Sequence, residues 1–166
     1  MTIPKDPDGD AEYRRRLDLR RRALDDGLDL LGWLFDPLDA EEAYLSVSRL
    51  GAVVEEYLGD DDQMVAAWWI RRPHVERRLL AGGRLVMRAR DAADAPVIIP
   101  GASPPDYAVR RVWAAISPTT SLTDIRTVLT AYFSRNYRIV DFELDTARVG
   151  GRYLLAQKGE ISPEAR

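Results

Sequence analysis

The stretch from Pro104 to Gln157 constrains the fold most, because it predicts a capped helix that runs into a pair of strands. Ser121 lies three residues before Asp124, which is the spacing of a helix N-cap, and a carboxylate there favours the positive end of the helix dipole. Apolar residues then recur at three- and four-residue steps on one face: Leu122, Ile125, Val128, Leu129, Tyr132 and Phe133. This face needs an apolar partner.

A second helix is expected just before it, so that helices cover about 105–134. Its end is marked by Ser117-Pro118, because a residue before proline is pushed out of the α region. Its apolar positions are Val109, Val112, Trp113 and Ile116. Beyond the capped helix, Val149-Gly150-Gly151 separates two runs of strand-forming residues. This pattern predicts an antiparallel hairpin over about 137–157.

The first part of the chain reads as helical from about residue 10 to residue 72. A long helix is expected from Asp10 to the Asp36-Pro37 stop, with Tyr13, Leu17, Leu24, Leu28, Leu31 and Phe35 on one face. Asp39 and Glu42 form a second capping signal, and that helix is expected to continue to Gly59. A third, shorter helix is expected to contain Met64, Val65, Trp68 and Trp69 before Pro73.

From His74 the pattern changes, and Gly82-Gly83 permits a tight turn in a hairpin over about 75–90. A helix that ends at Gly82 as its C-cap fits the first arm equally well. Residues 92–105 contain four prolines and predict a linker, in which Val97-Ile98-Ile99 can add a short edge strand. The expected fold is therefore α+β, with a flexible segment 1–9, subdomains 10–91 and 106–158, and a tail 159–166.

Composition excludes several classes of protein. The chain has 166 residues, 46% hydrophobic and 31% charged, which is the balance of one folded domain. It has no cysteine, so disulfides, thiolate metal sites and cysteine nucleophiles are impossible. Residues 1–10 lack the apolar core of a signal peptide, and no apolar run reaches the length of a membrane span. We expect a protein of the cytoplasm or of a particle assembled there, such as a virion.

Charge differs along the chain. Residues 1–62 contain 17 acidic and 8 basic side chains, whereas residues 63–166 contain 10 acidic and 16 basic ones. The segment from Arg71 to Arg90 has seven arginines and one acid, Glu76. Phosphate contacts are one use for such a patch, but 75–90 lacks the interleaved aromatic residues of a base-stacking platform. We therefore expect these arginines to contact solvent or the acidic surface of a neighbouring subunit, and not nucleic acid.

The sequence offers no catalytic set. His74 is the only histidine, so a histidine metal site or a histidine-centred triad would lack its other members. Asp60, Asp61 and Asp62 are consecutive and lack the ligand spacing of a calcium loop. We expect no catalytic residues, no metal, no cofactor and no enzymatic activity.

The C-terminal third resembles the end of tailed-phage tail or baseplate proteins of the tail protein I type. The similar pieces are Ala108-Val109-Arg110-Arg111-Val112-Trp113, Thr120-Ser121-Leu122-Thr123-Asp124-Ile125 and Tyr137-Arg138-Ile139-Val140-Asp141-Phe142. The resemblance extends to segment 10–17, which is similar to the entry helix of many tail proteins, and to segment 30–34. It implies a structural protein that binds neighbouring subunits of a tail or baseplate.

A second resemblance is local. Tyr57-Leu58-Gly59-Asp60 and Trp69-Ile70-Arg71-Arg72-Pro73-His74, followed by Gly82-Gly83-Arg84, are similar to the toxin-binding domain of the Xre, MbcA and ParS antitoxins. This implies the alternative function, an antitoxin-like module that neutralises a toxin. Both resemblances imply a protein that binds proteins.

The expected contacts with partner subunits come from the basic segment and from an apolar patch, either the helix around Trp33, Leu34 and Phe35 or the Trp68-Trp69 pair. The interface candidates are Trp33, Phe35, Trp68, Trp69, Arg71, Arg72, Arg77 and Arg78. The opposite charges of the two halves predict head-to-tail stacking into a homo- or hetero-oligomeric ring. In that arrangement, Trp33→Ala or Trp69→Ala should weaken association more than Arg15→Ala.

Overall fold

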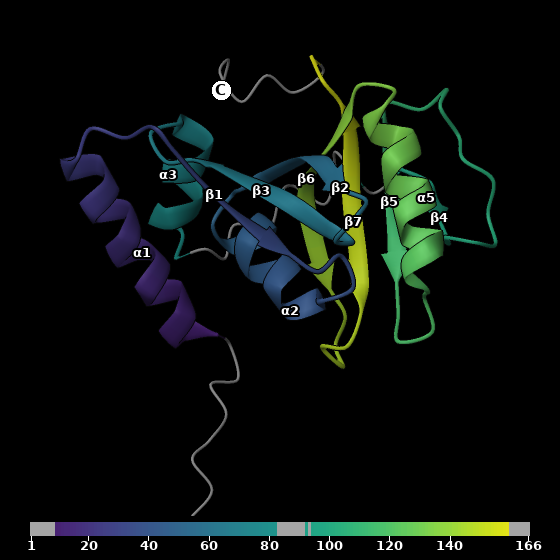
Figure 1. The fold of residues 1–166 in the computed structure, drawn as a ribbon, viewed down its shortest axis with the longest axis horizontal. Helices are drawn as coiled ribbons and strands as arrows, with labels where there is room; N and C mark the ends of the chain where they lie inside the picture. The colour runs from purple at the N-terminus through teal and green to yellow at the C-terminus, as the bar shows by residue number, and fades with distance from the viewer. Residues whose placement is uncertain (1–8, 83–91, 93, 160–166) are drawn as a thin grey trace, which may run out of the picture.

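One seven-stranded sheet organises the chain, in the order β1-β3-β2-β6-β7-β5-β4 (Figure 1). The computed structural model describes residues 9–82, 92 and 94–159. The helices are α1 (Asp10–Asp25), α2 (Ala40–Ala43) with its π-helical continuation η1 (Tyr44–Arg49), α3 (Pro73–Leu80) and α5 (Leu122–Phe133). The strands are β1 (Leu30–Phe35), β2 (Val53–Leu58), β3 (Gln63–Trp69), β4 (Val97–Ile98), β5 (Arg111–Ile116), β6 (Tyr137–Leu144) and β7 (Gly151–Gln157). The α+β class is confirmed.

The sheet has two halves that cross obliquely. Strands β1, β3 and β2 form an antiparallel group, and β6, β7 and β5 form a second one, with β4 parallel to β5. The two halves join through β2 and β6, where Val54 pairs with Ile139. In Figure 1, β1 and β3 run diagonally across the direction of β7. The two subdomains expected on either side of the 92–105 linker therefore share one sheet.

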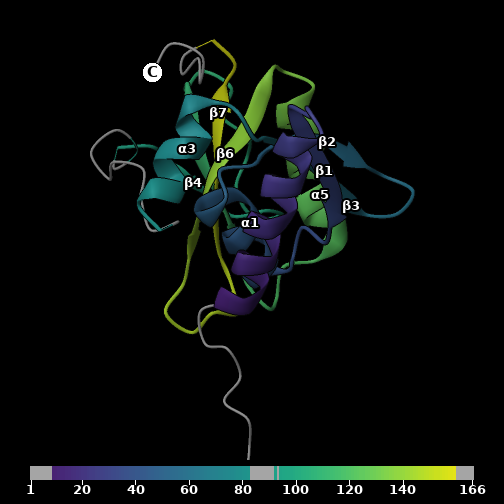
Figure 2. The same cartoon turned by 90° about the vertical axis from the view of Figure 1, so that its left-hand side faces the viewer.

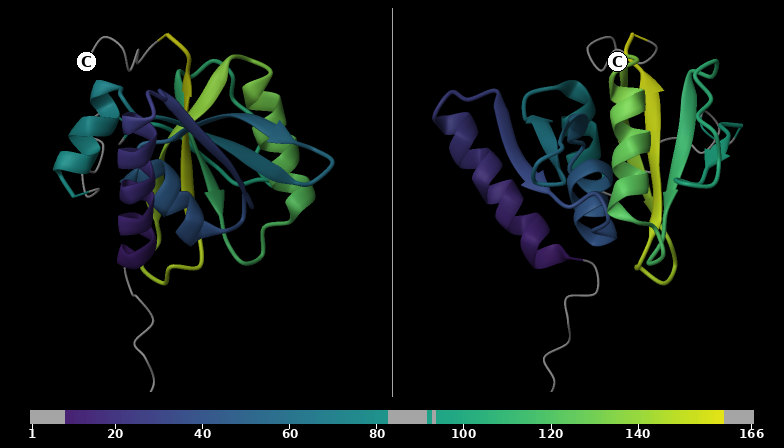
Figure 3. Two further views of the ribbon diagram at one scale, coloured as in Figure 1. Left: turned by 60° about the vertical axis from the view of Figure 1, so that its left-hand side comes forward. Right: turned by 45° about the vertical axis from the view of Figure 1, so that its right-hand side comes forward.

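Helices pack on the sheet from different sides. Helix α5 packs against β2 and β6, while η1 packs against β6. Figure 2 looks onto α1 with α3 beside it, and both panels of Figure 3 place α1 away from α5. The Arg16 guanidinium on α1 pairs with Glu42 on α2 at 3.1 Å, and Arg20 pairs with Glu76 on α3 at 3.6 Å. None of the described helices is long and apolar enough to cross a bilayer.

Several local predictions are confirmed. Ser121 Oγ accepts a hydrogen bond from the Asp124 backbone N–H at 3.1 Å, and Asp39 accepts one from Glu42 at 3.0 Å. The 137–157 hairpin is formed by β6 and β7. Residues 97–98 form the short edge strand β4. Helix α3 ends before Gly82, whose φ of 67° is the left-handed value of a glycine that ends a helix. The first arm of the segment 75–90 is therefore the helical alternative and not a hairpin strand. The second arm lies outside the described residues.

Four segments predicted as helix are strands: 30–35, 53–58, 63–69 and 111–116. In β3 the inner positions are buried and the alternate positions are partly exposed, which is a two-residue period. In β5 both faces are covered, so its apolar residues form a near-continuous run that spacing alone does not separate from a buried helix. Pairing with neighbouring strands therefore determines that these four segments are strands and not helices. The Asp60–Asp62 run forms the β2–β3 turn.

A buried arginine connects segments that lie on both sides of residues 92–105 in the sequence. Arg78 on α3 is 5% exposed, and its Nη1 donates to the backbone oxygens of Val47 and Ser48 on η1. Nη1 also lies 3.4 Å from Oδ1 of Asp141, and Nη2 donates to the Val140 oxygen at 3.4 Å. Asp141 follows a register shift in β6, and this irregularity lies beside the guanidinium. One side chain thus connects α3, η1 and β6.

Ion pairs within the molecule join the acidic first part of the sequence to the basic second part. Acidic residues of the first half pair with basic residues of the second half at Glu41–Arg148, Glu55–Lys158 and Asp62–Arg126, each 3.2 Å apart. Charges separated in sequence are therefore adjacent in space. The head-to-tail stacking of an acidic end on a basic end stays a prediction.

We predict that Arg78→Met lowers the free energy of unfolding by about 3–5 kcal/mol, because buried carbonyl oxygens and the Asp141 carboxyl lose their hydrogen-bond donor. Asp141→Asn keeps an acceptor of the same shape and should cost only about 1 kcal/mol. Urea denaturation followed by circular dichroism measures both. Exposed Arg77→Met is the matched control, with a change within about 0.5 kcal/mol. Equal losses for Arg77→Met and Arg78→Met would contradict this role.

Candidate functional site

Three of the eight expected interface residues lie in the interior. Trp68 is fully buried and its Nε1 donates to the Leu50 oxygen at 2.7 Å. Phe35 is 4% exposed, and the buried Arg78 connects α3 with η1 and β6. These three side chains cannot contact a partner of the folded chain, and their prediction as interface residues is corrected. The physical reason is that aromatic and guanidinium groups also serve as core and cross-linking groups.

Trp33 supports the fold from the inner side of β1. Its Nε1 donates to Ser46 Oγ at 3.0 Å, and its ring meets Trp68 edge-on with centroids 5.9 Å apart. The Arg16 guanidinium lies 4.5 Å from its ring centroid. Ser46 in turn donates to Glu42 at 2.9 Å. Trp33→Ala would thus disturb the contacts between β1, η1 and α1, so it is a poor test of association.

The other four candidates are near the surface around the end of β3. Trp69 is 37% exposed, and the Arg72 guanidinium lies 5.5 Å from its ring centroid. Arg71 pairs with Asp29 at 2.6 Å and donates to backbone oxygens at the end of α1. Arg77 is exposed on α3. The structure therefore brings together Trp69, Arg71 and Arg72, whereas the other arginines predicted for the basic segment, at 84, 88 and 90, lie outside the described residues.

An exposed apolar surface extends from Trp69 along the outer side of β1 and β3. We define the apolar sheet face as Leu30, Leu34, Val65, Ala67 and Trp69. Leu30 and Leu34 are 42% and 49% exposed, and Val65 and Ala67 are partly exposed. The strand register places Leu30 opposite Trp69 and Leu34 opposite Val65, so these residues form adjacent cross-strand pairs. Clustered exposure of this kind typically marks an interaction surface.

Leu30 was not expected at the interface, and Leu34 was expected there only as part of a long helix with Trp33 and Phe35. A signal was available: Leu30–Phe35 is an uninterrupted apolar run of strand length between Asp29 and Asp36-Pro37. The helical spacing of Leu24, Leu28 and Leu31 concealed it. Which of its residues face outward could not be known until β1 was paired with β3.

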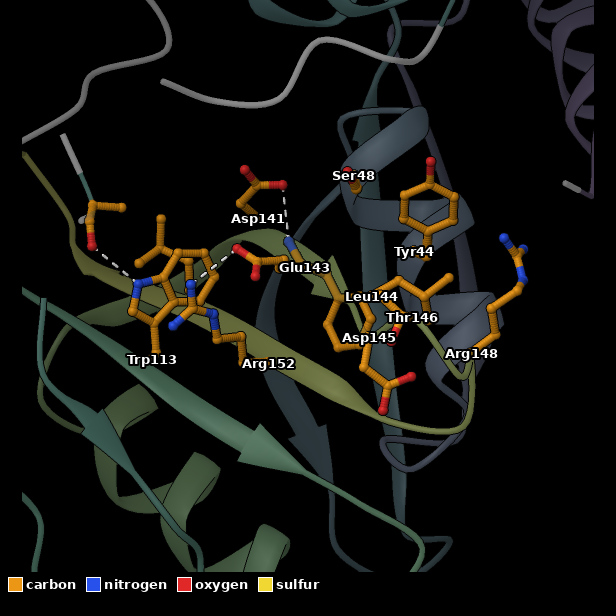
Figure 4. Close-up of a pocket in the computed structure, with 13 residues that line it drawn as sticks. Tyr44, Ser48, Trp113, Asp141, Glu143, Leu144, Asp145, Thr146, Arg148 and Arg152 are labelled. Carbon is orange, nitrogen blue, oxygen red and sulfur yellow. Dashed lines mark hydrogen bonds and ion pairs between the residues drawn. The ribbon is translucent and has the colours of Figure 1, made fainter. Parts of the chain in front are cut away.

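A cavity of about 620 Å³ lies on the other half of the sheet, between η1, the end of β6, β7 and β5. Figure 4 shows Arg152 over Trp113 at one side and Tyr44 with Arg148 at the other. The Arg152 guanidinium lies 4.3 Å from the Trp113 centroid and 3.0 Å from Glu143. Both arginines of the cavity are thus engaged in ion pairs, since Arg148 contacts Glu41.

Asp141 is a buried acid at this cavity. Burial raises the pKa of its carboxyl, while Arg78 and the Phe142 backbone N–H, which donates at 2.9 Å, act in the opposite direction. A buried carboxyl in a cleft is a candidate for proton transfer. The lining residues that the structure describes, however, include no histidine, lysine or thiol to act with it. Within the described ranges, no group of acidic and histidine side chains is arranged to hold a metal ion.

His74 lies apart from the residues that line this cavity. Its Nε2 is 3.2 Å from the Gly51 oxygen, which requires the proton on Nε2, and its buried Nδ1 has no hydrogen-bond partner among the described residues. Burial is the main cause that lowers the pKa of His74 to about 4, with Arg78 adding repulsion. The contacts are those of a structural histidine between α3 and the loop before β2.

We predict that acid weakens the fold through His74. Because its pKa is about 4 in the folded chain and 6.5 in a model peptide, the unfolded chain binds a proton first as the pH falls. The stabilising contribution is complete above pH 6.5 and is lost as the pH decreases towards 4. His74→Gln does not titrate and keeps a donor for Gly51, so its free energy of unfolding should fall less over this range. Urea titrations of both proteins at several pH values measure the difference, and parallel curves would contradict the prediction.

Comparisons with family models, with curated proteins and with solved structures find no match to this chain.

Proposed function

We propose that this protein is a non-enzymatic binding module of a protein assembly, and that it docks through the apolar sheet face. The observation that carries the proposal is the exposure of Leu30, Leu34 and Trp69 on adjacent positions of β1 and β3. Exposed large apolar side chains are ordinary when scattered, but these three belong to one pleated surface. Tryptophan at such a surface supplies a large contact area with little loss of side-chain entropy.

The charges around this face fit a protein partner. Arg72 packs over Trp69, and Arg71 is half exposed beside Asp29, so the apolar centre has a polar border of both signs at this end. An apolar centre with a polar border is the usual arrangement of a protein interface. The cavity lined by Asp141 and Trp113 differs, because the charged groups there already satisfy one another.

Among assemblies, we propose a phage-type tail or baseplate, in which the chain would bind neighbouring subunits in the virion or in the host cytoplasm. Support comes from the resemblance of residues 107–144 and 10–17 to tail proteins of the tail protein I type. The helix expected at 108–113 in that resemblance is replaced mainly by β5 here, while the Ser121-capped helix and the following strand are present.

An antitoxin-like module is the alternative, and one observation favours it. The segment that resembles the antitoxins, Trp69-Ile70-Arg71-Arg72-Pro73-His74, begins at one end of the apolar sheet face and exposes Trp69 and Arg71. A toxin docked on this segment would cover the same tryptophan. The two functions therefore share a surface and differ in the partner.

We predict that a photo-crosslinker attached to Leu34→Cys captures a partner protein, because this position lies within the proposed docking surface. The chain has no native cysteine, so labelling is specific to the introduced thiol. The matched control is Leu80→Cys on α3, since Leu80 is 88% exposed and lies outside the face. Labelled protein is illuminated in extract of the native cell or particle, and the adducts are identified by mass spectrometry.

The expected result is a defined protein adduct from position 34 and none from position 80. A virion subunit as adduct supports the tail assignment, and a toxin supports the alternative. Equal capture at both positions, or none at position 34, would overturn the proposal. Circular dichroism of both labelled variants checks that the fold is retained.

A further inference from the structure

The two edges of the sheet are built differently. Strand β4, at one edge, has only two residues and lies between Pro96 and Pro100, so it offers few backbone groups for pairing. Strand β1, at the other edge, has six residues and pairs with β3 in register without a bulge. It contains no charged residue and no proline. Short length, a β-bulge, charged residues and proline are usual protections of an edge strand against pairing, and β1 has none of these four.

We propose that β1 pairs with β1 of a second copy, antiparallel and about a two-fold axis at Gly32. This inference rests on the proposed function and names the first partner of the apolar sheet face. In a two-fold antiparallel pair, residues directly opposite each other must be on the same side of the sheet. Centring on Gly32 meets this condition and places Leu30 opposite Leu34 of the second copy.

This register aligns the exposed apolar side chains across both molecules. One row runs from Trp69 through Leu30 to Leu34 and Val65 of the second copy, because Leu30 pairs with Trp69 and Leu34 with Val65 in each chain. The symmetry axis repeats the row, and a middle row contains Gly32 and Ala67 of both copies. Direct cross-strand pairs of apolar residues stabilise a sheet, so the apolar sheet face is self-complementary in this arrangement.

Disulfide trapping tests the register. Leu30→Cys in one chain and Leu34→Cys in another should form a mixed disulfide, because opposite Cα atoms in antiparallel strands lie about 4.5–5.5 Å apart, within disulfide range. Leu30→Cys alone should not crosslink, since two copies of residue 30 are about four residues, or roughly 13 Å, apart along the strands. Leu80→Cys, which lies outside the proposed interface, measures the disulfide yield that random collision produces. Mixed product well above both single-variant products is the expected result.

Sedimentation equilibrium tests the dimer itself. The wild-type chain should show a concentration-dependent monomer–dimer equilibrium. Leu30→Lys with Leu34→Lys places lysine opposite lysine at both pairs, and the dissociation constant should rise about tenfold or more. Leu30→Glu with Leu34→Lys places opposite charges at the same pairs and should recover much of the association. Both substitutions are at exposed positions, and circular dichroism confirms that each variant is folded.

Two results would overturn the proposed dimer. One is a wild-type chain that stays monomeric at every concentration. The other is a dimer that forms no mixed 30–34 disulfide and whose dissociation constant is the same in both charge variants as in the wild type. A monomeric chain that still captures another protein from position 34 overturns the dimer and keeps the proposed function. Failure of both experiments overturns both proposals.

Discussion

The buried guanidinium of Arg78 is the interaction on which the arrangement of this fold depends. It enters the core from α3 and satisfies backbone oxygens of η1 and β6 together with the Asp141 carboxyl. A charge that is 5% exposed is tolerated only if its donors are matched. This requirement fixes three segments from both sides of residues 92–105. The helical turn at η1 and the irregularity in β6 are the local adjustments that bring their oxygens to one place.

The two halves of the sheet differ in how completely their charged groups are paired and their apolar side chains are covered. Around the cavity, Arg152 covers Trp113 and pairs with Glu143, and Arg148 pairs with Glu41. At the other end, the inner side of β1 is similarly occupied by the contacts of Trp33 with Ser46 and Trp68. Its outer side and free edge carry apolar side chains without an equivalent cover in the described chain. This difference is why the outer side of β1, and not the cavity, supports a binding function.

The eight interface candidates show what residue type alone can indicate. Tryptophan and arginine are enriched at interfaces, and Trp69 and Arg71 do lie at the surface beside the apolar sheet face. The same residue types also form the interior, as Trp68 and Arg78 do. Leu34 belonged to the expected apolar patch but Leu30 did not, because a leucine carries no signal until its exposure is known. Burial separates these cases, and burial is a property of the folded chain.

The sequence by itself determined the features that depend on neighbouring residues: the Ser121 and Asp39 caps, the β6–β7 hairpin, the short strand in the proline-rich segment and the α+β class. Their physics is local, because a cap or a turn needs only a few consecutive residues. Tertiary structure decided that 30–35, 53–58, 63–69 and 111–116 are strands, since apolar runs of this length fit either a helix or a strand. Only hydrogen bonding between segments far apart in sequence selects the strand, and the same pairing leaves β1 at the edge with Leu30 and Leu34 exposed.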